Sequence, residues 1–307
     1  MTTRISVNGV IGDDHAQISV LDRGFLYGDS IYEVLRTYRG EPWALEPHLD
    51  RLQKSAELLM MGRIDRALIE REMRATIAAA VDAGDGGGGE KHDESYVRVI
   101  VTRGTGPISL DLAVAAAPSR VIIVTPVRAL DPALYQRGVK VFVVHASGSA
   151  VAATHGAKSG NYLPNILALA RAREHDAHEA LLVDAHGHIA EGSSSNVFAR
   201  YGETLCTPPL DVGILEGITR RTIIELGREA GMTVEERNLT PEELAAADEV
   251  FLTSTLREVL PVTRVDGVLA DGDGTLTEET LVGDGKPGAV AHALRRAYRR
   301  RVGDPLP

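Results

Sequence analysis

The chain has 307 residues, of which 44% are hydrophobic and 25% charged, as in a globular protein of one large or two ordinary domains. Its formal net charge of −10 at pH 7 argues against a nucleic-acid or anionic-membrane surface as the main partner. The single cysteine, Cys206, excludes an intrachain disulfide and a cysteine-based metal site. The first residues lack the apolar core of a signal peptide, and no apolar run approaches the ~20 residues that span a bilayer, so a cytoplasmic protein is expected.

Short strands are expected between residues 4 and 20, with Asn8-Gly9 as a hairpin signal. A second strand should precede residue 39, because alternation there places Tyr32, Arg36 and Tyr38 on one face. These side chains could line a polar pocket, or they could form cross-strand aromatic pairs at a sheet edge.

A helix is predicted from Glu46 to about Met61, since Leu49 and Leu52 begin an apolar stripe at helical spacing. Arg51 lies beside that stripe, where a solvated arginine is the ordinary interpretation. A second helix, from about Arg66 to Ala83, and a glycine-rich connector follow. The connector lacks the Gly-Lys-Ser/Thr ending of a phosphate loop, so we assign it no chemistry.

The next strand, at residues 95–103, places Tyr96, Arg98 and Ile100 on one face. An arginine on the inner side of a strand is costly unless an anion pairs with it. Arg98 is therefore a candidate for binding the carboxylate of a substrate.

Breaks in the pattern divide the chain into two domains. A strand is expected at 119–127. From the end of this strand onwards, Pro126, Pro132 and Gly138 interrupt a weak periodic pattern, which is typical of a linker. We predict a small α/β domain at 1–125, a linker at 126–138 and a large domain at 139–307.

Lysine is scarce in this chain, with five lysines against 28 arginines. Lys158 lies among small and polar residues just before an apolar helical pattern. Desolvation in such a place lowers an amine's pKa and makes it a better nucleophile and Schiff-base former. A surface lysine at a helix N-terminus is the alternative. A strand at 180–184 and a turn then lead to Glu191, which Gly-Ser-Ser-Ser-Asn follows.

Two later turns offer donors for an anion. Residues 213–220 read Gly-Ile-Leu-Glu-Gly-Ile-Thr-Arg and lead into a helix that ends near Ala230. Free amides and a threonine hydroxyl at a helix start suit an anion, although a plain helix cap is the alternative. A strand from Glu249 to Ser254 then ends in the hydroxyl-rich turn Thr255-Leu256-Arg257.

Three other patterns are set aside. Residues 271–273 (Asp-Gly-Asp) mimic a phosphatase nucleophile motif, but only about 30 residues follow them. Residues 283–288 match G-x-G-x-x-G without room for a βαβ unit. Asp184, His186 and His188 cross a turn without a fourth ligand, so no metal site is expected.

Taken together, Lys158-Ser-Gly-Asn-Tyr162, Glu191-Gly-Ser-Ser-Ser-Asn and the Ile-Leu-Glu-Gly-Ile-Thr-Arg motif resemble the fold-type IV pyridoxal phosphate (PLP) enzymes. These include branched-chain aminotransferases, D-amino acid aminotransferases and aminodeoxychorismate lyases. The resemblance extends over nearly the whole chain. It implies an α/β (α+β) fold with a small α/β domain and a larger domain with a β-barrel-like core, PLP between them, and a homodimer.

The resemblance also implies roles for individual residues. Catalytic Lys158 holds PLP as a lysine aldimine and then acts as general base, Glu191 keeps the pyridine nitrogen protonated, and Tyr162 bonds the ring 3-oxygen. Arg51 matches the family's His-x-x-Arg-Leu arginine, which reaches the cofactor phosphate. The other expected phosphate contacts are Gly217, Ile218, Thr219 and Thr255. The expected substrate-binding residues are Tyr27, Tyr32, Arg36, Tyr96, Arg98 and the amide near Leu256.

The function implied is ping-pong transamination between an L-branched-chain amino acid and 2-oxoglutarate. D-amino acid aminotransferases carry an arginine and a histidine where this chain has Ile108 and Leu110, which weakens that alternative. Arg257 is unusual for the branched-chain type, where a small residue is expected. A D-amino acid or (R)-amine transaminase, an aminodeoxychorismate lyase and a non-catalytic PLP-binding module remain open.

Overall fold

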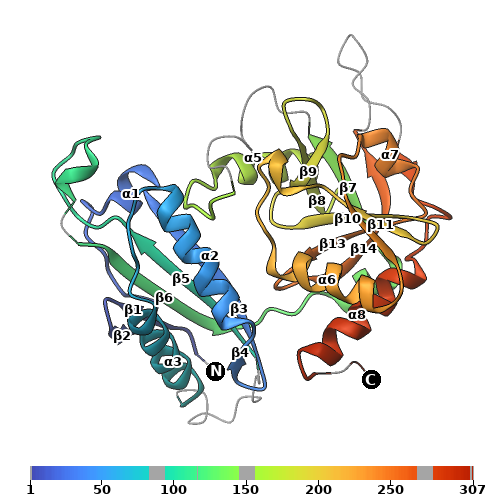
Figure 1. Ribbon diagram of the computed structural model, residues 1–307. Coiled ribbons are helices and arrows are strands. Elements are labelled where there is room, and N and C mark those ends of the chain that lie inside the picture. Colours follow the sequence, from blue (N-terminus) through green and yellow to red (C-terminus); the bar gives the residue numbers. More distant parts are fainter. Residues whose placement is uncertain are drawn as a thin grey trace. The chain divides into compact units, whose positions relative to one another are not determined.

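The computed structural model describes residues 2–82, 94–115, 117–144, 156–267, 279–304 and 306. The chain forms two compact units, shown in Figure 1. The first comprises Met1–Arg128 and Ala157–Asn161, and the second comprises Ala129–Gly156 and Tyr162–Pro307. The segment that holds Lys158 thus belongs to the first unit, although it follows the start of the second in sequence. The domain limits drawn from the sequence stay a prediction.

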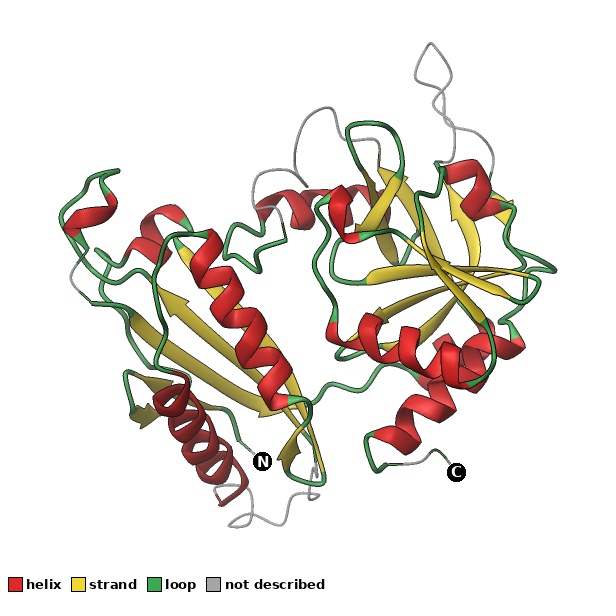
Figure 2. Ribbon diagram, viewed as in Figure 1, coloured by secondary structure: helices red, strands yellow, loops and turns green. Residues whose placement is uncertain are grey.

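The first unit is an antiparallel six-stranded sheet in the order β2-β1-β6-β5-β3-β4, with two long helices on one face (Figure 2). Its strands are β1 (Arg4–Val7), β2 (Val10–Gly12), β3 (Ser30–Tyr38), β4 (Glu41–Pro42), β5 (Ser95–Thr102) and β6 (Ser119–Pro126). Its helices are α1 (Arg23–Tyr27), α2 (Leu45–Leu58), α3 (Arg66–Asp82) and the 3-10 turn at Leu112–Val114.

The core of the first unit lies between the sheet and α2 and α3. Ile31 and Leu35 of β3 and Val97 and Val99 of β5 are buried in one cluster with apolar side chains of both helices. Such positions lie an even number of residues apart within each strand, as the side-chain period of two requires. The alternation in the sequence therefore selects the face that the helices cover.

The other face of β3 and β5 gathers the polar side chains expected from the sequence. Arg36 lies opposite Tyr96, and Tyr32 lies opposite Ile100, in the antiparallel register of the two strands. Directly opposed residues share a face of a sheet. The register therefore places Tyr32, Arg36, Tyr96 and Arg98 on the same side, away from the core.

The second unit is built on a mixed sheet, nine-stranded within the described residues, in the order β12-β11-β10-β13-β14-β7-β8-β9 with β15 beside β14. Its strands are β7 (Val139–Val144), β8 (Glu179–Val183), β9 (Ile189–Gly192), β10 (Asn196–Tyr201), β11 (Thr204–Thr207), β12 (Thr233–Glu236), β13 (Glu249–Ser254), β14 (Glu258–Asp266) and β15 (Thr280–Leu281). Its helices are α4 (Pro132–Arg137), α5 (Leu163–Glu174), the 3-10 turn at Leu210–Val212, α6 (Ile218–Glu229), α7 (Pro241–Ala245) and α8 (Ala289–Arg301).

This sheet curls around a buried aliphatic core (Figure 2). Val141, Val197, Val250 and Leu260, from four strands, are all at most 1% exposed within that core. The curled sheet confirms the α/β fold class with a barrel-like core in the larger part of the protein.

Three short α-helices of the described residues, α1, α4 and α7, were not expected from the sequence. Helix α1 is capped by the Asp22 carboxylate and ends at Gly28, while α4 lies inside the predicted linker and is capped by Asp131. Caps hold such short helices together where periodicity has too few residues to be read. Of the sequence patterns, the glycine-rich connector and Asp271-Gly-Asp273 lie outside the described residues. Among the described helices, none combines the length and apolar character that a bilayer crossing needs.

Candidate active site

Lys158 is attached to the first unit by its backbone. Its carbonyl oxygen accepts from the Tyr32 amide at 2.9 Å, and its own amide donates to Ser55 Oγ at 3.0 Å. The Lys158 Nζ lies 4.5 Å from the centroid of the Tyr32 ring, and the Arg98 guanidinium carbon lies 4.1 Å from the same centroid. The predicted catalytic lysine and two predicted substrate residues are thus brought together around one aromatic ring.

Arg51 is held by a buried carboxylate that sequence reasoning did not assign. Its Nε and Nη2 each donate to Glu33 at 2.7 Å, and His48 Nδ1 lies 2.7 Å from Glu33 Oε2. Glu33 is 1% exposed. Burial alone would raise the pKa of Glu33, but Arg51 and then His48 outweigh it and hold that pKa well below its usual range.

Helix α2 supplies three polar side chains along one face. His48, Arg51 and Ser55 follow one another at helical spacing, and all three are buried. Burial lowers the pKa of His48 below its usual range, against the opposing effect of Glu33. His48 is therefore neutral at pH 7, and its Nδ1–H can donate to the carboxylate. The pairing of Glu33 fixes the guanidinium of Arg51 at a defined place on this face.

Other predicted substrate residues of the first unit take part in ion pairs or cation–aromatic contacts. Arg36 forms an ion pair with Glu94, and its guanidinium stacks 4.9 Å from the Tyr38 ring centroid. The Arg23 guanidinium lies 5.0 Å from the Tyr27 ring centroid. Within the ranges that the structure describes, no carboxylate pairs with Arg98, and its role toward a substrate stays a prediction.

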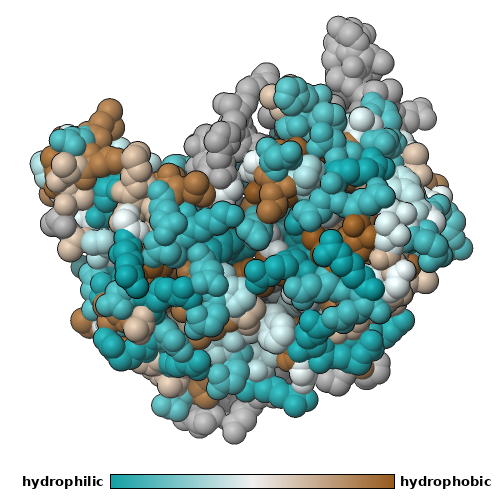
Figure 3. Space-filling model, viewed as in Figure 1, coloured by the Kyte–Doolittle hydropathy of each residue, from teal (hydrophilic) through white to brown (hydrophobic). Residues whose placement is uncertain are grey.

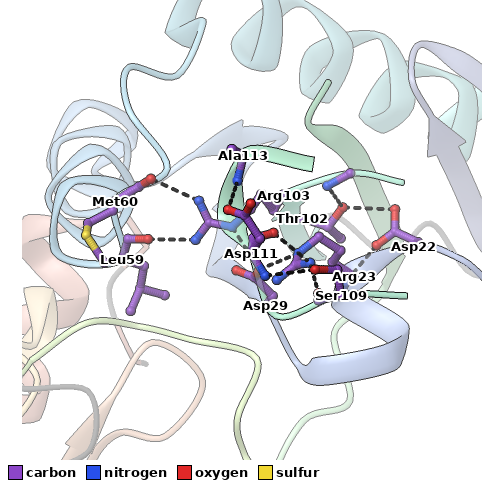
Figure 4. Close-up of polar contacts among 12 residues, drawn as sticks. Asp22, Arg23, Asp29, Leu59, Met60, Thr102, Arg103, Ser109, Asp111 and Ala113 are labelled. Carbon is purple, nitrogen blue, oxygen red and sulfur yellow. Dashed lines mark hydrogen bonds and ion pairs between the residues drawn. The ribbon is translucent and has the colours of Figure 1, made fainter. Parts of the chain in front are cut away.

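A second ion-paired carboxylate, the half-buried Asp29, holds the segments next to this sheet (Figure 4). Arg23 Nε and Arg103 Nε donate to Asp29 Oδ2 at 2.9 and 2.8 Å. Arg23 also donates to the Ser109 carbonyl at 2.6 Å, and Arg103 donates to the carbonyl of Leu59 at 2.7 Å. One carboxylate thus ties the end of α2 to the loop that carries Ile108 and Leu110, whose side chains are 76% and 82% exposed.

In the second unit, Glu191 is oriented by two donors. Its Oε2 accepts from the Leu215 amide at 3.1 Å and from Asn196 Nδ2 at 3.3 Å. Asn196 Nδ2 also donates to the Leu215 carbonyl at 3.0 Å. Asn196 was not assigned from the sequence, although it directly follows the serine run after Glu191. It joins Glu191 to the turn that leads into α6.

The start of α6 is an uncapped helix N-terminus. Gly217 is the N-cap residue, and no side chain in the described part of the chain caps the helix. Ile218 and Thr219, its first residues, are buried. The first amides of a helix have no intrahelical partner and attract an anion. A side chain at Gly217 would overlap Asn196 Oδ1, so glycine allows Asn196 to pack against the start of α6.

The second unit also carries the predicted residues Thr255, Leu256 and Tyr162. Asn196 is paired with Thr253 of β13, so the turn with Thr255 and Leu256 lies beside the Asn196 strand. Tyr162 donates its hydroxyl proton to the Ser193 carbonyl at 2.7 Å. The second unit thus holds Glu191, the α6 N-terminus and the Thr255 turn around Asn196, while the first holds the lysine and the arginines.

The first unit carries an amine, and the second carries a carboxylate with fixed donors and an uncapped helix start. Groups of these kinds are the ones that a phosphorylated, nitrogen-containing cofactor requires. The family model described as "Amino-transferase class IV" matches residues 30–265. The chain therefore belongs to the class IV amino-transferase family and is an aminotransferase. Fold-type IV aminotransferases depend on PLP.

Individual relatives agree on the class and differ in substrate. The chain is 36% identical over 266 residues to a protein provisionally named branched-chain-amino-acid aminotransferase from Methanocaldococcus jannaschii, covering 86% of this chain and 88% of that protein. It is 32% identical over 291 residues to the D-alanine aminotransferase of Bacillus licheniformis, covering 93% and 92%. A solved branched-chain amino acid aminotransferase from Escherichia coli superposes with a TM-score of 0.80 at 26% identity, covering 100% of this chain and 97% of that one. A solved branched-chain amino acid aminotransferase with pyridoxamine 5'-phosphate superposes with a TM-score of 0.84 at 27% identity, covering 98% and 94%.

Proposed function

We propose that this enzyme binds PLP and transfers the amino group of an L-branched-chain amino acid to 2-oxoglutarate in a ping-pong reaction. The observation that carries the proposal is the donor set. Lys158 lies beside Tyr32 and Arg98 in one unit, and Glu191 and the open α6 N-terminus share Asn196 in the other. Each group matches one chemical feature of PLP: its aldehyde, its pyridine nitrogen and its phosphate.

The residues present fit the phosphate. The amides of Ile218 and Thr219 begin α6, where the helix dipole favours an anion. Gly217 lets Asn196 pack directly against this helix start, because a side chain there would overlap Asn196. Arg51, fixed by Glu33, and the Thr255 hydroxyl are the further phosphate contacts that we propose.

The residues also fit the ring. The Glu191 carboxylate, oriented by the Leu215 amide and Asn196, is suited to keep a pyridine nitrogen protonated. We propose that Tyr162 donates its single hydroxyl proton to the ring 3-oxygen when the cofactor is bound, in place of the Ser193 carbonyl that accepts it at 2.7 Å.

When bound, PLP supplies an electron sink for the negative charge that develops at the substrate Cα. Lys158 Nζ would hold the cofactor, and the same nitrogen would serve as the general base for the proton at the substrate Cα. The Tyr32 ring lies 4.5 Å from Lys158 Nζ and limits the positions that the lysine side chain can take.

We propose that the Arg98 guanidinium binds a carboxylate of the substrate. It lies on the Tyr32 ring without a carboxylate partner in the described parts of the chain. Tyr27, Arg36, Tyr96 and the Leu256 amide are the other substrate contacts that we propose. Ile108 and Leu110 cannot bind a carboxylate as the arginine and histidine of D-amino acid aminotransferases do.

The second candidate is a D-amino acid or (R)-amine transaminase, which the 32% identity to a D-alanine aminotransferase favours. An aminodeoxychorismate lyase is the third, since a Bacillus subtilis relative of that name is 29% identical over 265 residues, covering 86% of this chain and 87% of that protein. A PLP-binding module without catalysis would need neither a Cα base nor Arg98.

We also propose a homodimer. Exposed apolar side chains occur in the first unit around α1 and the loop after β5, where Figure 3 shows hydrophobic surface. Val20, Phe25, Ile108 and Leu110 are each more than half exposed there. A large apolar area of this kind is typical of a surface that another chain covers. A cytoplasmic location stays a prediction from the sequence.

The test is a spectroscopic half-reaction. Purified enzyme loaded with PLP is mixed separately with L-leucine, L-glutamate and D-alanine, and the loss of the visible cofactor band is followed. Loss with the two L-amino acids alone supports the proposal, whereas loss with D-alanine alone establishes the second candidate. Absence of any visible band contradicts PLP binding.

The matched variants are Lys158→Ala and Lys286→Ala. Because Lys158 is the proposed base and cofactor attachment, its removal should lower kcat by at least about 10²-fold. Lys286, whose side chain is 79% exposed, should be replaceable without effect. Normal turnover by Lys158→Ala would exclude the mechanism.

A further inference from the structure

A fully buried carboxylate in the second unit has no role in the mechanism above. Glu179, at the start of β8, is 0% exposed. Ser193, Ser194 and Ser195 all donate hydroxyl protons to it, the latter two at 3.1 and 3.2 Å. Arg257 Nη1 lies 3.0 Å from Glu179 Oε2. Three consecutive serines and one arginine thus converge on a single carboxylate.

The serine turn is connected to a proposed cofactor contact. The Ser193 carbonyl accepts from the Tyr162 hydroxyl at 2.7 Å and from Asn165 Nδ2 at 2.9 Å. The Gly192 amide donates to the Ser195 carbonyl at 2.6 Å. Glu179 therefore holds the turn that the Tyr162 hydroxyl contacts.

Arg257 connects the same carboxylate to the turn between β13 and β14. Its Nη1 also donates to Ser194 Oγ at 2.8 Å and to the Ser194 carbonyl at 3.3 Å. Its amide donates to Ser254 Oγ at 3.2 Å, and its carbonyl accepts from the Tyr135 hydroxyl at 3.0 Å. Thr255 and Leu256 directly precede Arg257. We assign the Leu256 amide to the substrate carboxylate.

The turn has a second anchor on its other side. Glu258, with a positive φ of 58°, is 1% exposed and pairs with Arg295 at 3.1 Å and Arg299 at 2.8 Å, both on α8. This anchor does not depend on Arg257. A variant at Arg257 should therefore keep the hairpin and lose only the connection to the serine turn.

We propose that Arg257 is a positioning residue that, through Glu179 and Ser194, fixes the Thr255–Leu256 turn for the carboxylate of the amino acid. A buried ion pair seldom stabilises a fold beyond what apolar residues would achieve, because desolvation offsets the attraction. The ion pair instead holds the serine turn and the Thr255–Leu256 turn in place relative to each other, so that the Thr255–Leu256 turn is already ordered before substrate binds. The inference rests on the proposed transaminase function.

The test compares Arg257→Met, Arg257→Lys and the control Arg296→Met in the PLP-loaded enzyme. The kinetic constants are measured with whichever of L-leucine, L-glutamate and D-alanine the natural enzyme turns over. Arg257→Met should raise KM about tenfold with kcat changed less than about twofold, since binding of the carboxylate is weakened throughout the reaction. Arg257→Lys should recover most of the loss, because a single nitrogen, Nη1, makes every side-chain contact. Exposed Arg296 should be neutral.

Two results would overturn the inference: an unchanged KM in Arg257→Met, or a Lys variant as defective as the Met variant. If Arg257→Met does not fold, Ser194→Ala replaces it, because that exposed hydroxyl bonds both Glu179 and Arg257. A KM increase of about threefold is then expected at constant kcat, and an unchanged KM again contradicts the inference. Failure of the natural enzyme to turn over any amino acid would instead contradict the proposed function.

Discussion

Replacement of Gly217 by alanine tests the link between the phosphate site and Glu191. Gly217 has φ −68° and ψ 131°, which any residue can adopt, so the substitution adds no backbone strain. The new Cβ would overlap Asn196 Oδ1 and lie 3.1 Å from Arg220 Cβ. The Asn196 amide must therefore move, and with it the bonds that it makes to Glu191 and to the Leu215 carbonyl.

The magnitude follows from two contributions. Overpacking in a filled site costs about 1–3 kcal/mol. Weakening the hydrogen bond from Asn196 to the Glu191 carboxylate costs up to about 1.5–3 kcal/mol, since one partner is charged. Because the two effects share the movement of one side chain, they are not fully additive. We expect the free energy of unfolding to fall by about 2–4 kcal/mol and the PLP dissociation constant to rise at least about tenfold.

The assay is urea unfolding of the cofactor-free protein followed by circular dichroism, together with a spectrophotometric titration with PLP. Gly12→Ala is the matched control, because Gly12 has no heavy atom within 4 Å of an added Cβ and no left-handed φ. It should change stability by less than about 0.5 kcal/mol. A loss below about 1 kcal/mol in Gly217→Ala, with natural PLP affinity, would refute the packing of Asn196 against Gly217.

Two more predictions concern the ion-paired carboxylates of the first unit. Glu33→Gln should lower the free energy of unfolding by about 3 kcal/mol, because it leaves a buried arginine without its anion, whereas exposed Glu46→Gln should have little effect in the same urea assay. Burial would raise the pKa of Asp29, but Arg103 and Arg23 outweigh it and keep that pKa below its usual range. The stability from Asp29 is therefore fully present above an unfolded pKa of about 3.9 and is lost as pH falls through the lower folded pKa. Asp29→Asn should lower stability at pH 7 and flatten its decline in acid, and an unchanged acid profile in urea titrations would contradict this account.

Short sequence patterns predicted the local structure of individual segments and the kind of chemistry that each segment could support. The period-2 alternation predicted that Tyr32 and Arg36 share a strand face, and the antiparallel register confirms this and adds Tyr96 to it. The Gly-Ile-Thr pattern predicted an open helix start, and Gly217 is its N-cap, with no side chain capping the first turn in the described part of the chain. Such features depend on residues a few positions apart, so they can be read without the fold.

Some elements were within reach of the sequence but were missed. Helix α4 begins at Asp131-Pro132, a capping residue followed by proline at the first helical position, which is a start signal. Glu33 lies in the strand that was singled out, but nothing in the alternation shows that a carboxylate on the core face is paired.

Only the tertiary structure decided which charged groups meet. Arg51 lies 18 residues from Glu33 and Arg257 lies 78 residues from Glu179, yet each pair is in contact, and both carboxylates are buried. The fold likewise joins the Lys158 segment to β3 of the first unit. Helix and strand periods are set by neighbouring residues, whereas the pairing of buried charges depends on strand order, register and helix placement, because these bring residues distant in sequence within a few ångströms.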